Sequence, residues 1–289
     1  MSSRAIRAGL ALLALVGCRD NRSAAPAVTA DTAIATPAAA PSSNVVTFIA
    51  RDYGFEGPAQ IPAGATFFRL DNQGKELHQL VIVRLDQGRT YDSLLAAMRS
   101  PGPPPAWMHL AGGPNAINPG ATSNATERLA EGHYAVLCFI PGADGLPHLA
   151  KGMIAPLEVT PAVAPAARDV PADVTIKVLD YAFVLSGPLT PGNHVIRVEN
   201  AGPQPHELML ARLAPGKAIK DIEKWVSGGE KGLPPVSSIG GVAPMMANES
   251  GQFVVDLAPG DYALICFLPD GKDGKAHLLH GMVKQIKVG

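Results

Sequence analysis

The run Gly132-His133-Tyr134-Ala135-Val136-Leu137-Cys138 returns later in the chain as Gly260-Asp261-Tyr262-Ala263-Leu264-Ile265-Cys266. Both runs are apolar and end on a cysteine, as a buried β-strand would. Alternate side chains of a strand point to the same face, so Tyr134, Val136 and Cys138 are expected to face one core together.

The repeat extends over most of the chain. Asp52-Tyr53-Gly54-Phe55 returns as Asp180-Tyr181-Ala182-Phe183, and Asn72-Gln73-Gly74 before His78 returns as Asn200-Ala201-Gly202 before His206. These pairs are shifted by 128 positions, and the shift becomes 129 at His148 and His277. Two copies of this length indicate a duplicated domain. We expect domains at 45–160 and 172–289, joined by an Ala- and Pro-rich linker at 161–171.

Each copy is expected to be an all-β Greek-key sandwich with a short helical insertion. The 30 glycines and 27 prolines, with only 5% aromatic residues, favour many short strands joined by turns. The expected strands are Val45–Ile49, Thr66–Asp71, Leu80–Val83, Tyr134–Cys138 and Ile154–Val159, then Val174–Val178, His194–Glu199, Leu208–Leu213, Tyr262–Cys266 and Met282–Val288. Helices are expected at Tyr91–Met98 and Ala218–Val226.

The first residues predict export. Arg4 and Arg7 precede an apolar run too short to span a bilayer, so residues 1–17 are expected to be a signal peptide. Leu15-Val16-Gly17-Cys18 resembles the bacterial lipobox, whose cysteine receives a lipid, although an ordinary secretory signal could also contain a cysteine. The lipobox interpretation implies a protein anchored through Cys18 on the periplasmic or another extracytoplasmic side of a membrane. Residues 18–44 would then be a flexible tether rich in Ala, Pro and Ser.

Charge and cysteine usage narrow the possibilities further. The formal net charge is −1, which does not indicate a nucleic-acid partner. Apart from Cys18 the chain has only Cys138 and Cys266, one in each copy. An unpaired thiol in an exported protein is explained by burial, by a disulfide between the domains or by metal ligation.

Each copy carries the same four candidate ligands in the same order. A histidine follows the Asn-x-Gly turn, a cysteine ends a strand, and a histidine and a methionine follow in the next loop. These are His78, Cys138, His148 and Met153, then His206, Cys266, His277 and Met282. Singly, such residues are more often core or surface residues, but a thiolate, two imidazoles and a weak thioether together suit copper in both oxidation states. The pattern resembles the cupredoxin family, and the resemblance implies one type 1-like copper per domain.

The cysteine-to-histidine loops depart from the small blue copper proteins. Nine residues separate Cys138 from His148 and ten separate Cys266 from His277, closer to the loop of nitrite-reductase-like proteins. This spacing leaves open an altered coordination geometry or the loss of copper in one domain. His280 corresponds to Lys151 and is expected at the surface, with an alternative ligand role left open. Met245 and Met246 are expected to pack in the core rather than capture further copper.

Two kinds of function are compatible with these residues, and a third is not expected. The first is transfer of single electrons between membrane-associated redox partners, such as a cytochrome-containing assembly. The second is a copper-free scaffold that docks to a membrane complex, or a copper buffer. An oxidase or nitrite reductase is not expected, because Cys138 and Cys266 are flanked by apolar residues and the chain has no His-x-His pair.

Overall fold

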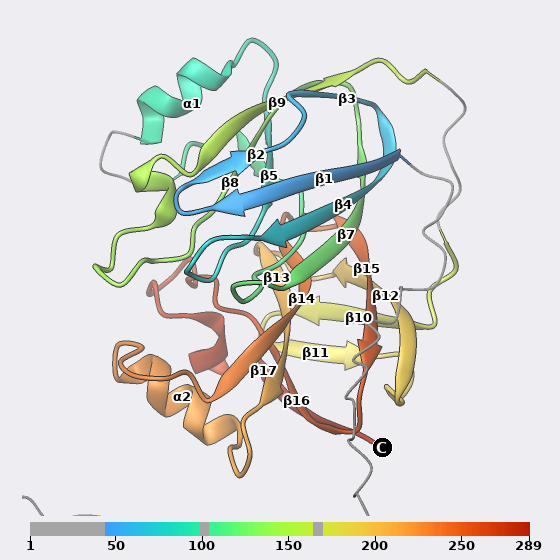
Figure 1. Ribbon diagram of the computed structural model, residues 1–289, viewed down its shortest axis with the longest axis vertical. Helices are drawn as coiled ribbons and strands as arrows, with labels where there is room; N and C mark the ends of the chain where they lie inside the picture. The colour runs from blue at the N-terminus through green and yellow to red at the C-terminus, as the bar shows by residue number, and fades with distance from the viewer. Residues whose placement is uncertain (1–43, 99–103, 164–169) are drawn as a thin grey trace, which may run out of the picture. The chain divides into compact units, whose positions relative to one another are not determined.

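The computed structural model describes residues 44–98, 104–163 and 170–289 (Figure 1). The predicted signal peptide, Cys18, the tether up to residue 43 and residues 164–169 of the predicted linker lie outside the described residues. In the part that is described, no helix is both long and apolar enough to cross a membrane.

The first half of the described chain runs from Asn44 to Thr160. Its strands are β1 (Asn44–Arg51), β2 (Gly54–Glu56), β3 (Gln60–Pro62), β4 (Gly64–Asn72), β5 (Val81–Leu85), β6 (Met108–Leu110), β7 (Thr122–Leu129), β8 (Gly132–Leu137) and β9 (Ile154–Thr160). Helix α1 (Tyr91–Met98) follows β5, and a short 3-10 turn, η1 (His148–Lys151), precedes β9.

The second half runs from Val174 to Val288 and repeats this order, with no described strand in the place of β3. Its strands are β10 (Val174–Leu179), β11 (Ala182–Leu185), β12 (Gly192–Asn200), β13 (His206–Leu213), β14 (Val236–Met245), β15 (Ser250–Leu257), β16 (Gly260–Ile265) and β17 (Val283–Val288). Helix α2 (Ile219–Ser227) follows β13, and the 3-10 turn η2 (His277–His280) precedes β17.

Each half has two sheets, which confirms the expected all-β sandwich class. In the first half β2-β1-β4-β7 faces β3-β9-β8-β5-β6, and in the second β11-β10-β12-β15 faces β14-β13-β16-β17. Strands β1 and β4 pair in parallel, as do β10 and β12, so the chain must leave the sheet between them, as Greek-key connections do. In Figure 1 the first sheets of the two halves can be followed as one sheet through the β7–β15 contact.

The core of each half lies between its two sheets. In the first half Tyr134, Val136 and Cys138 belong to one buried cluster, whereas Ala135 and Leu137 belong to another under α1. The expected alternation along β8 is therefore confirmed. Cys266 lies in the corresponding cluster of the second half. Each strand thus directs its cysteine into the sandwich, at the end where the strand stops.

The two halves share a segment that the sequence did not mark as a strand. Ala111, Pro114 and Ile117 of the first half pair with Met245, Val242 and Ile239 of β14 in the second half. Asn118 donates hydrogen bonds from Nδ2 to Ser237 Oγ at 2.8 Å and to Ser238 O at 3.0 Å. The halves are therefore joined by backbone pairing as well as by side-chain packing.

Candidate metal centres

The structure brings His78, Cys138 and His148 together in the first half. All three side chains are fully buried, and one possible ligand atom from each lies within 4.8 Å of the other two. The Nδ1 atoms of His78 and His148 are 3.1 Å apart, and Cys138 Sγ lies 3.6 Å from His148 Nδ1. Residues distant in sequence thus turn one sulfur and two imidazole nitrogens toward a common point.

The second half repeats this arrangement with His206, Cys266 and His277. The Nδ1 atoms of His206 and His277 are again 3.1 Å apart, and Cys266 Sγ lies 3.4 Å from His277 Nδ1 and 4.0 Å from His206 Nδ1. The near identity of the two sets, despite different loop lengths, indicates that the scaffold and not the loop length fixes the geometry.

The Asn-x-Gly turn positions the first histidine of each set. Asn72 accepts the Gly74 N–H at 2.9 Å and donates to Glu76 O and Ile117 O, each at 2.8 Å. Glycine is required because a Cβ on Gly74 would lie 2.5 Å from His78 Nε2. Asn200 and Gly202 form the same contacts around His206.

The long cysteine-to-histidine loops close on themselves. In the first loop Cys138 N donates to Met153 O at 3.2 Å, Leu149 N to Cys138 O at 2.9 Å and Met153 N to His148 O at 3.0 Å. In the second, Cys266, Leu278, Met282 and His277 make the same three bonds at 3.2, 3.0 and 3.0 Å. The residues between form a hairpin whose tip, at 143–146 in the first loop and 271–275 in the second, is exposed, and the bonds at its base hold the histidine in the same place in both loops.

The two methionines are fully buried in the same core clusters as the cysteines. Met153 shares its cluster with Cys138, and Met282 shares its cluster with Cys266. Both follow the 3-10 turn that carries the second histidine, after a glycine in the left-handed conformation. Each therefore lies in the core cluster of its cysteine, where its thioether could serve as a weak fourth ligand.

Carboxylates hold the outer nitrogens of three of the four histidines, a feature that the sequence reasoning missed. His78 Nε2 donates to Asp52 at 3.1 Å, His148 Nε2 to Glu76 at 2.6 Å and His206 Nε2 to Asp180 at 2.6 Å. Asp52 and Asp180 belong to the Asp-Tyr-x-Phe motif, which recurs at the shift of 128 positions. That recurrence is the sequence signal that could have indicated these two carboxylates. Such partners fix the tautomer and leave Nδ1 free to act as a ligand.

His277 differs from the other three. Its Nε2 is buried without a hydrogen-bond partner and lies 3.8 Å from Asp270 Oδ2. Asp270 is occupied by the Tyr181 hydroxyl and by Gln204 Nε2, the latter at 2.9 Å. Gln204 stands where the first copy has Glu76, so the two sites have different surroundings behind the same ligands.

The chemistry of the donor set fits a cation. Burial lowers the pKa of His78, His206 and His277, which favours neutral imidazoles. The hydrogen bonds to Asp52 and Glu76 use the Nε2 atoms of His78 and His148, and the two Nδ1 atoms face each other at 3.1 Å. Two ligands bound at about 2.0–2.3 Å to one ion can be at most about 4.5 Å apart, which the measured distances satisfy. Burial raises the pKa of the Cys138 thiol to about 12, so an ion would replace its proton.

Three other expectations from the sequence concern a disulfide, His280 and Met245. Cys138 and Cys266 are both free thiols, which excludes a disulfide between the domains. His280 is partly exposed and pairs with Asp273 at 3.1 Å, as Lys151 pairs with Asp144 at 2.8 Å in the first half. Met245 packs in the core of the second half, as expected.

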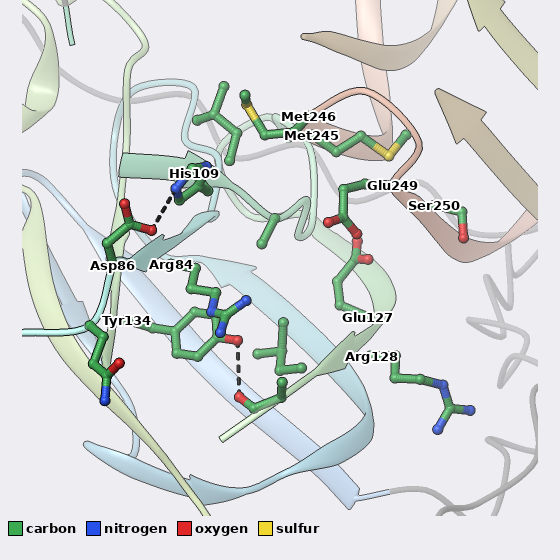
Figure 2. A pocket seen from close by; sticks show the side chains of 15 residues that line it. Arg84, Asp86, His109, Glu127, Arg128, Tyr134, Met245, Met246, Glu249 and Ser250 are labelled. Carbon is green, nitrogen blue, oxygen red and sulfur yellow. Dashed lines mark hydrogen bonds and ion pairs between the residues drawn. The ribbon is translucent and has the colours of Figure 1, made fainter. Parts of the chain in front are cut away.

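A cavity of about 380 Å³ lies beside the junction of the two halves and is separate from both ligand sets (Figure 2). Its wall includes Glu127 and Glu249, whose carboxylates point toward each other in Figure 2. Glu127 is buried, and its Oε1 accepts the Gly113 N–H at 2.9 Å. Burial, assisted by the charge of Glu249 and opposed by that of Arg197, holds the pKa of Glu127 well above its ordinary range.

Comparisons with known proteins give only distant structural likenesses. No family model and no curated protein matches the sequence. Reduced auracyanin from Roseiflexus castenholzii is 20% identical, with 42% of this chain and 100% of that one covered and a TM-score of 0.28. Blue copper oxidase from Nitrosomonas europaea is 13% identical, with 85% and 86% covered and a TM-score of 0.26. The copper nitrite reductase of the same organism is 17% identical, with 86% and 94% covered and a TM-score of 0.25.

Likeness at these scores carries no inference on function, which rests instead on the chain's own strand order and ligand geometry. The two all-β halves and their repeated ligand sets agree with the resemblance to cupredoxins that the sequence shows.

Proposed function

We propose that this cupredoxin-like chain binds one copper ion per domain and carries single electrons between redox partners. The observation that supports the proposal is the repeated set of a buried sulfur and two facing Nδ1 atoms, 3.1 Å apart in each half. When bound, copper would supply a one-electron Cu(II)/Cu(I) couple. The ligands would be His78, Cys138, His148 and Met153 in the first domain and His206, Cys266, His277 and Met282 in the second.

The chain's own residues would hold this geometry while the charge changes. The carboxylates of Asp52, Glu76 and Asp180 fix three of the imidazole rings by hydrogen bonds. Aromatic rings cover the second histidines, with Tyr53 5.2 Å from His148 and Tyr181 5.3 Å from His277 between ring centroids. Rings that are held and shielded from water need not rearrange when one electron arrives or leaves.

Electron transfer accounts for the residues beside the cysteines better than catalysis does. Leu137 and Phe139 flank Cys138, and Ile265 and Phe267 flank Cys266. None of these side chains can ligate a second copper ion next to the first. We therefore place the protein with electron carriers and not with copper oxidases or nitrite reductases.

We further propose that Cys18 carries a lipid that anchors the protein to the extracytoplasmic face of a membrane, close to membrane-associated partners such as a cytochrome-containing assembly. The support is the lipobox-like Leu15-Val16-Gly17-Cys18. Incorporation of labelled fatty acid into the wild type but not into Cys18→Ser would support this anchor, and equal labelling of both would contradict it.

Copper content and the visible spectrum test the central proposal. The purified wild type should bind two copper ions per chain and show an intense thiolate-to-copper absorption that dithionite bleaches. Cys138→Ser and Cys266→Ser should each lose one copper ion and part of the absorption, and the double variant should lose both. Unchanged copper content in the double variant, or bound copper that cannot be reduced, would contradict the proposal and favour a scaffold or a copper buffer.

A further inference from the structure

The segment from Pro114 to Ile117 connects the surroundings of the two sites. On one side Ile117 exchanges backbone hydrogen bonds with the ligand His78, at 2.9 and 3.3 Å. On the other side Asn115 N donates to Gly241 O of β14 at 3.1 Å. One short stretch of backbone therefore contacts a ligand residue of the first domain and the sheet of the second.

The Asn115 side chain extends this connection to the second site. It is fully buried, and its Nδ2 donates to Glu207 Oε2 at 3.1 Å and to Val242 O at 3.0 Å. Glu207 is also buried, and its other oxygen, Oε1, accepts the Phe267 N–H at 2.9 Å. Glu207 follows the ligand His206, and Phe267 follows the ligand Cys266. The Glu207 carboxylate thus links Asn115 of the first domain to Phe267, the neighbour of the ligand Cys266, and Glu207 is itself the neighbour of the ligand His206.

This bridge from the first domain to the second site has no counterpart that runs from the second domain to the first site. Position 128 residues after Asn115 is Ala243, whose side chain cannot donate a hydrogen bond, and the first-domain counterpart of Glu207 is the neutral Gln79. Burying a carboxylate is unfavourable unless donors replace the lost water. The donors here come from both domains. An apolar pair would pack equally well at this position, so the polar pair indicates a role other than packing.

We propose that the Asn115–Glu207 bridge couples the two metal sites, so that an electron delivered to one passes to the other within the chain. The inference rests on the proposed function. The route runs from His78 through its hydrogen bond with Ile117, along the backbone to Asn115, across to Glu207 and through the Phe267 amide to Cys266. In each transfer the reduced site loses one electron and the oxidised site gains it. No bond is broken and no proton needs to move.

The coupling predicts how partners use the protein. An electron entering at one domain would become available at the other, so a donor and an acceptor could bind different domains at the same time. Without the coupling each domain would have to meet both partners in turn.

Rapid reduction of the copper-loaded protein tests this coupling. A short pulse that delivers less than one electron per chain should be followed by redistribution between the sites at a rate independent of protein concentration. Asn115→Leu should slow this redistribution at least tenfold. The control Asn118→Leu removes the hydrogen bonds of another asparagine between the domains, those of Asn118 to Ser237 and Ser238, and should leave the rate within twofold of the wild type.

A second variant avoids an unpaired buried charge. Asn115→Leu combined with Glu207→Leu replaces both partners by apolar groups, a change that is often tolerated, and it should slow redistribution at least as much. In metal-free protein, Asn115→Leu should also speed hydrogen exchange at the Phe267 amide, whereas Asn118→Leu should not.

The outcomes separate this inference from the function on which it rests. If both sites bind copper and are reduced, but redistribution in both bridge variants stays within twofold of the wild type, the coupling is refuted and the proposed function stands. If the wild type binds no reducible copper, both fail.

Discussion

Replacing Glu76 by Gln should weaken copper binding at the first site while leaving the site assembled. Glu76 Oε2 accepts the Nε2–H of the buried His148 at 2.6 Å, and about a third of the Glu76 side chain is exposed (31%). Glutamine keeps an acceptor oxygen but removes the negative charge. The fold should tolerate the change because the second copy already has Gln204 at this position.

The expected size follows from the kind of hydrogen bond that is lost. A bond to a charged group contributes about 1.5–3 kcal/mol and a neutral one about 1 kcal/mol. The difference is thus about 0.5–2 kcal/mol, and partial exposure of Glu76 places it in the lower half of that range, about 1 kcal/mol, which corresponds to a roughly fivefold higher Kd for copper. The imidazole also becomes a weaker base when its partner carries no charge, which acts in the same direction.

Competition with a Cu(I) chelator measures this effect. A Cys266→Ser background would restrict the titration to the first site. Glu158→Gln is the matched control, since Glu158 pairs with the exposed His133 at 2.7 Å, at the end of the β8–β9 pair opposite to Cys138 and Met153. A Kd for Glu76→Gln that stays within twofold of the background protein would refute the role assigned to the carboxylate, and an equal loss in the control would show that the effect is not specific to the site.

Three further results are expected. Saturating copper should stabilise the protein by about 4 kcal/mol per site at a free concentration 1,000 times the Kd, so a chelator should lower the urea midpoint. Because the pKa of Glu127 is raised in the folded protein, its contribution to stability is complete below the ordinary value of 4.5. That contribution is lost as the pH rises through the higher folded-state pKa. Glu127→Gln should therefore unfold at higher urea than the wild type at pH 8 and show little difference at pH 4. Gly241→Ala should cost at least about 2 kcal/mol, because φ is +125° and the new Cβ would lie 2.0 Å from Leu208 O, whereas Gly216→Ala, with open space at φ +73°, should cost about 1 kcal/mol in the same urea titration.

The sequence was sufficient to predict the elements whose own residues carry the pattern. Strands with apolar or β-branched runs, such as β8 and β16, were expected within one or two residues of their observed bounds. Helix α1 was expected with the observed bounds. The two ligand sets were found because His, Cys, His and Met recur in the same order, although their role as ligands stays a prediction.

Two of the elements that were missed, β7 and β14, lie where the two halves meet. The inward positions of β7 include the polar Ser123 and Glu127, which lie beside Gly240 and Gly251 of the second half, so no apolar alternation marks this strand. Strand β14 contains Gly240, Gly241 and Pro244, residues that weaken any local strand signal. Likewise, nothing near Asn115 in the sequence indicates its bond to Glu207. Long-range pairing of this kind leaves little trace in one segment.

The self-closing hairpin between Cys and His has a consequence for recognising such proteins. Its ends are tied by the same three backbone bonds whether nine or ten residues lie between them, and its tip is exposed. Residues can therefore be inserted there during evolution, or by protein engineers grafting a recognition peptide, at little expense to the centre. A motif search with a fixed Cys-to-His gap would overlook these chains, whereas one that fixes the Asn-x-Gly turn and lets the gap vary would retrieve them.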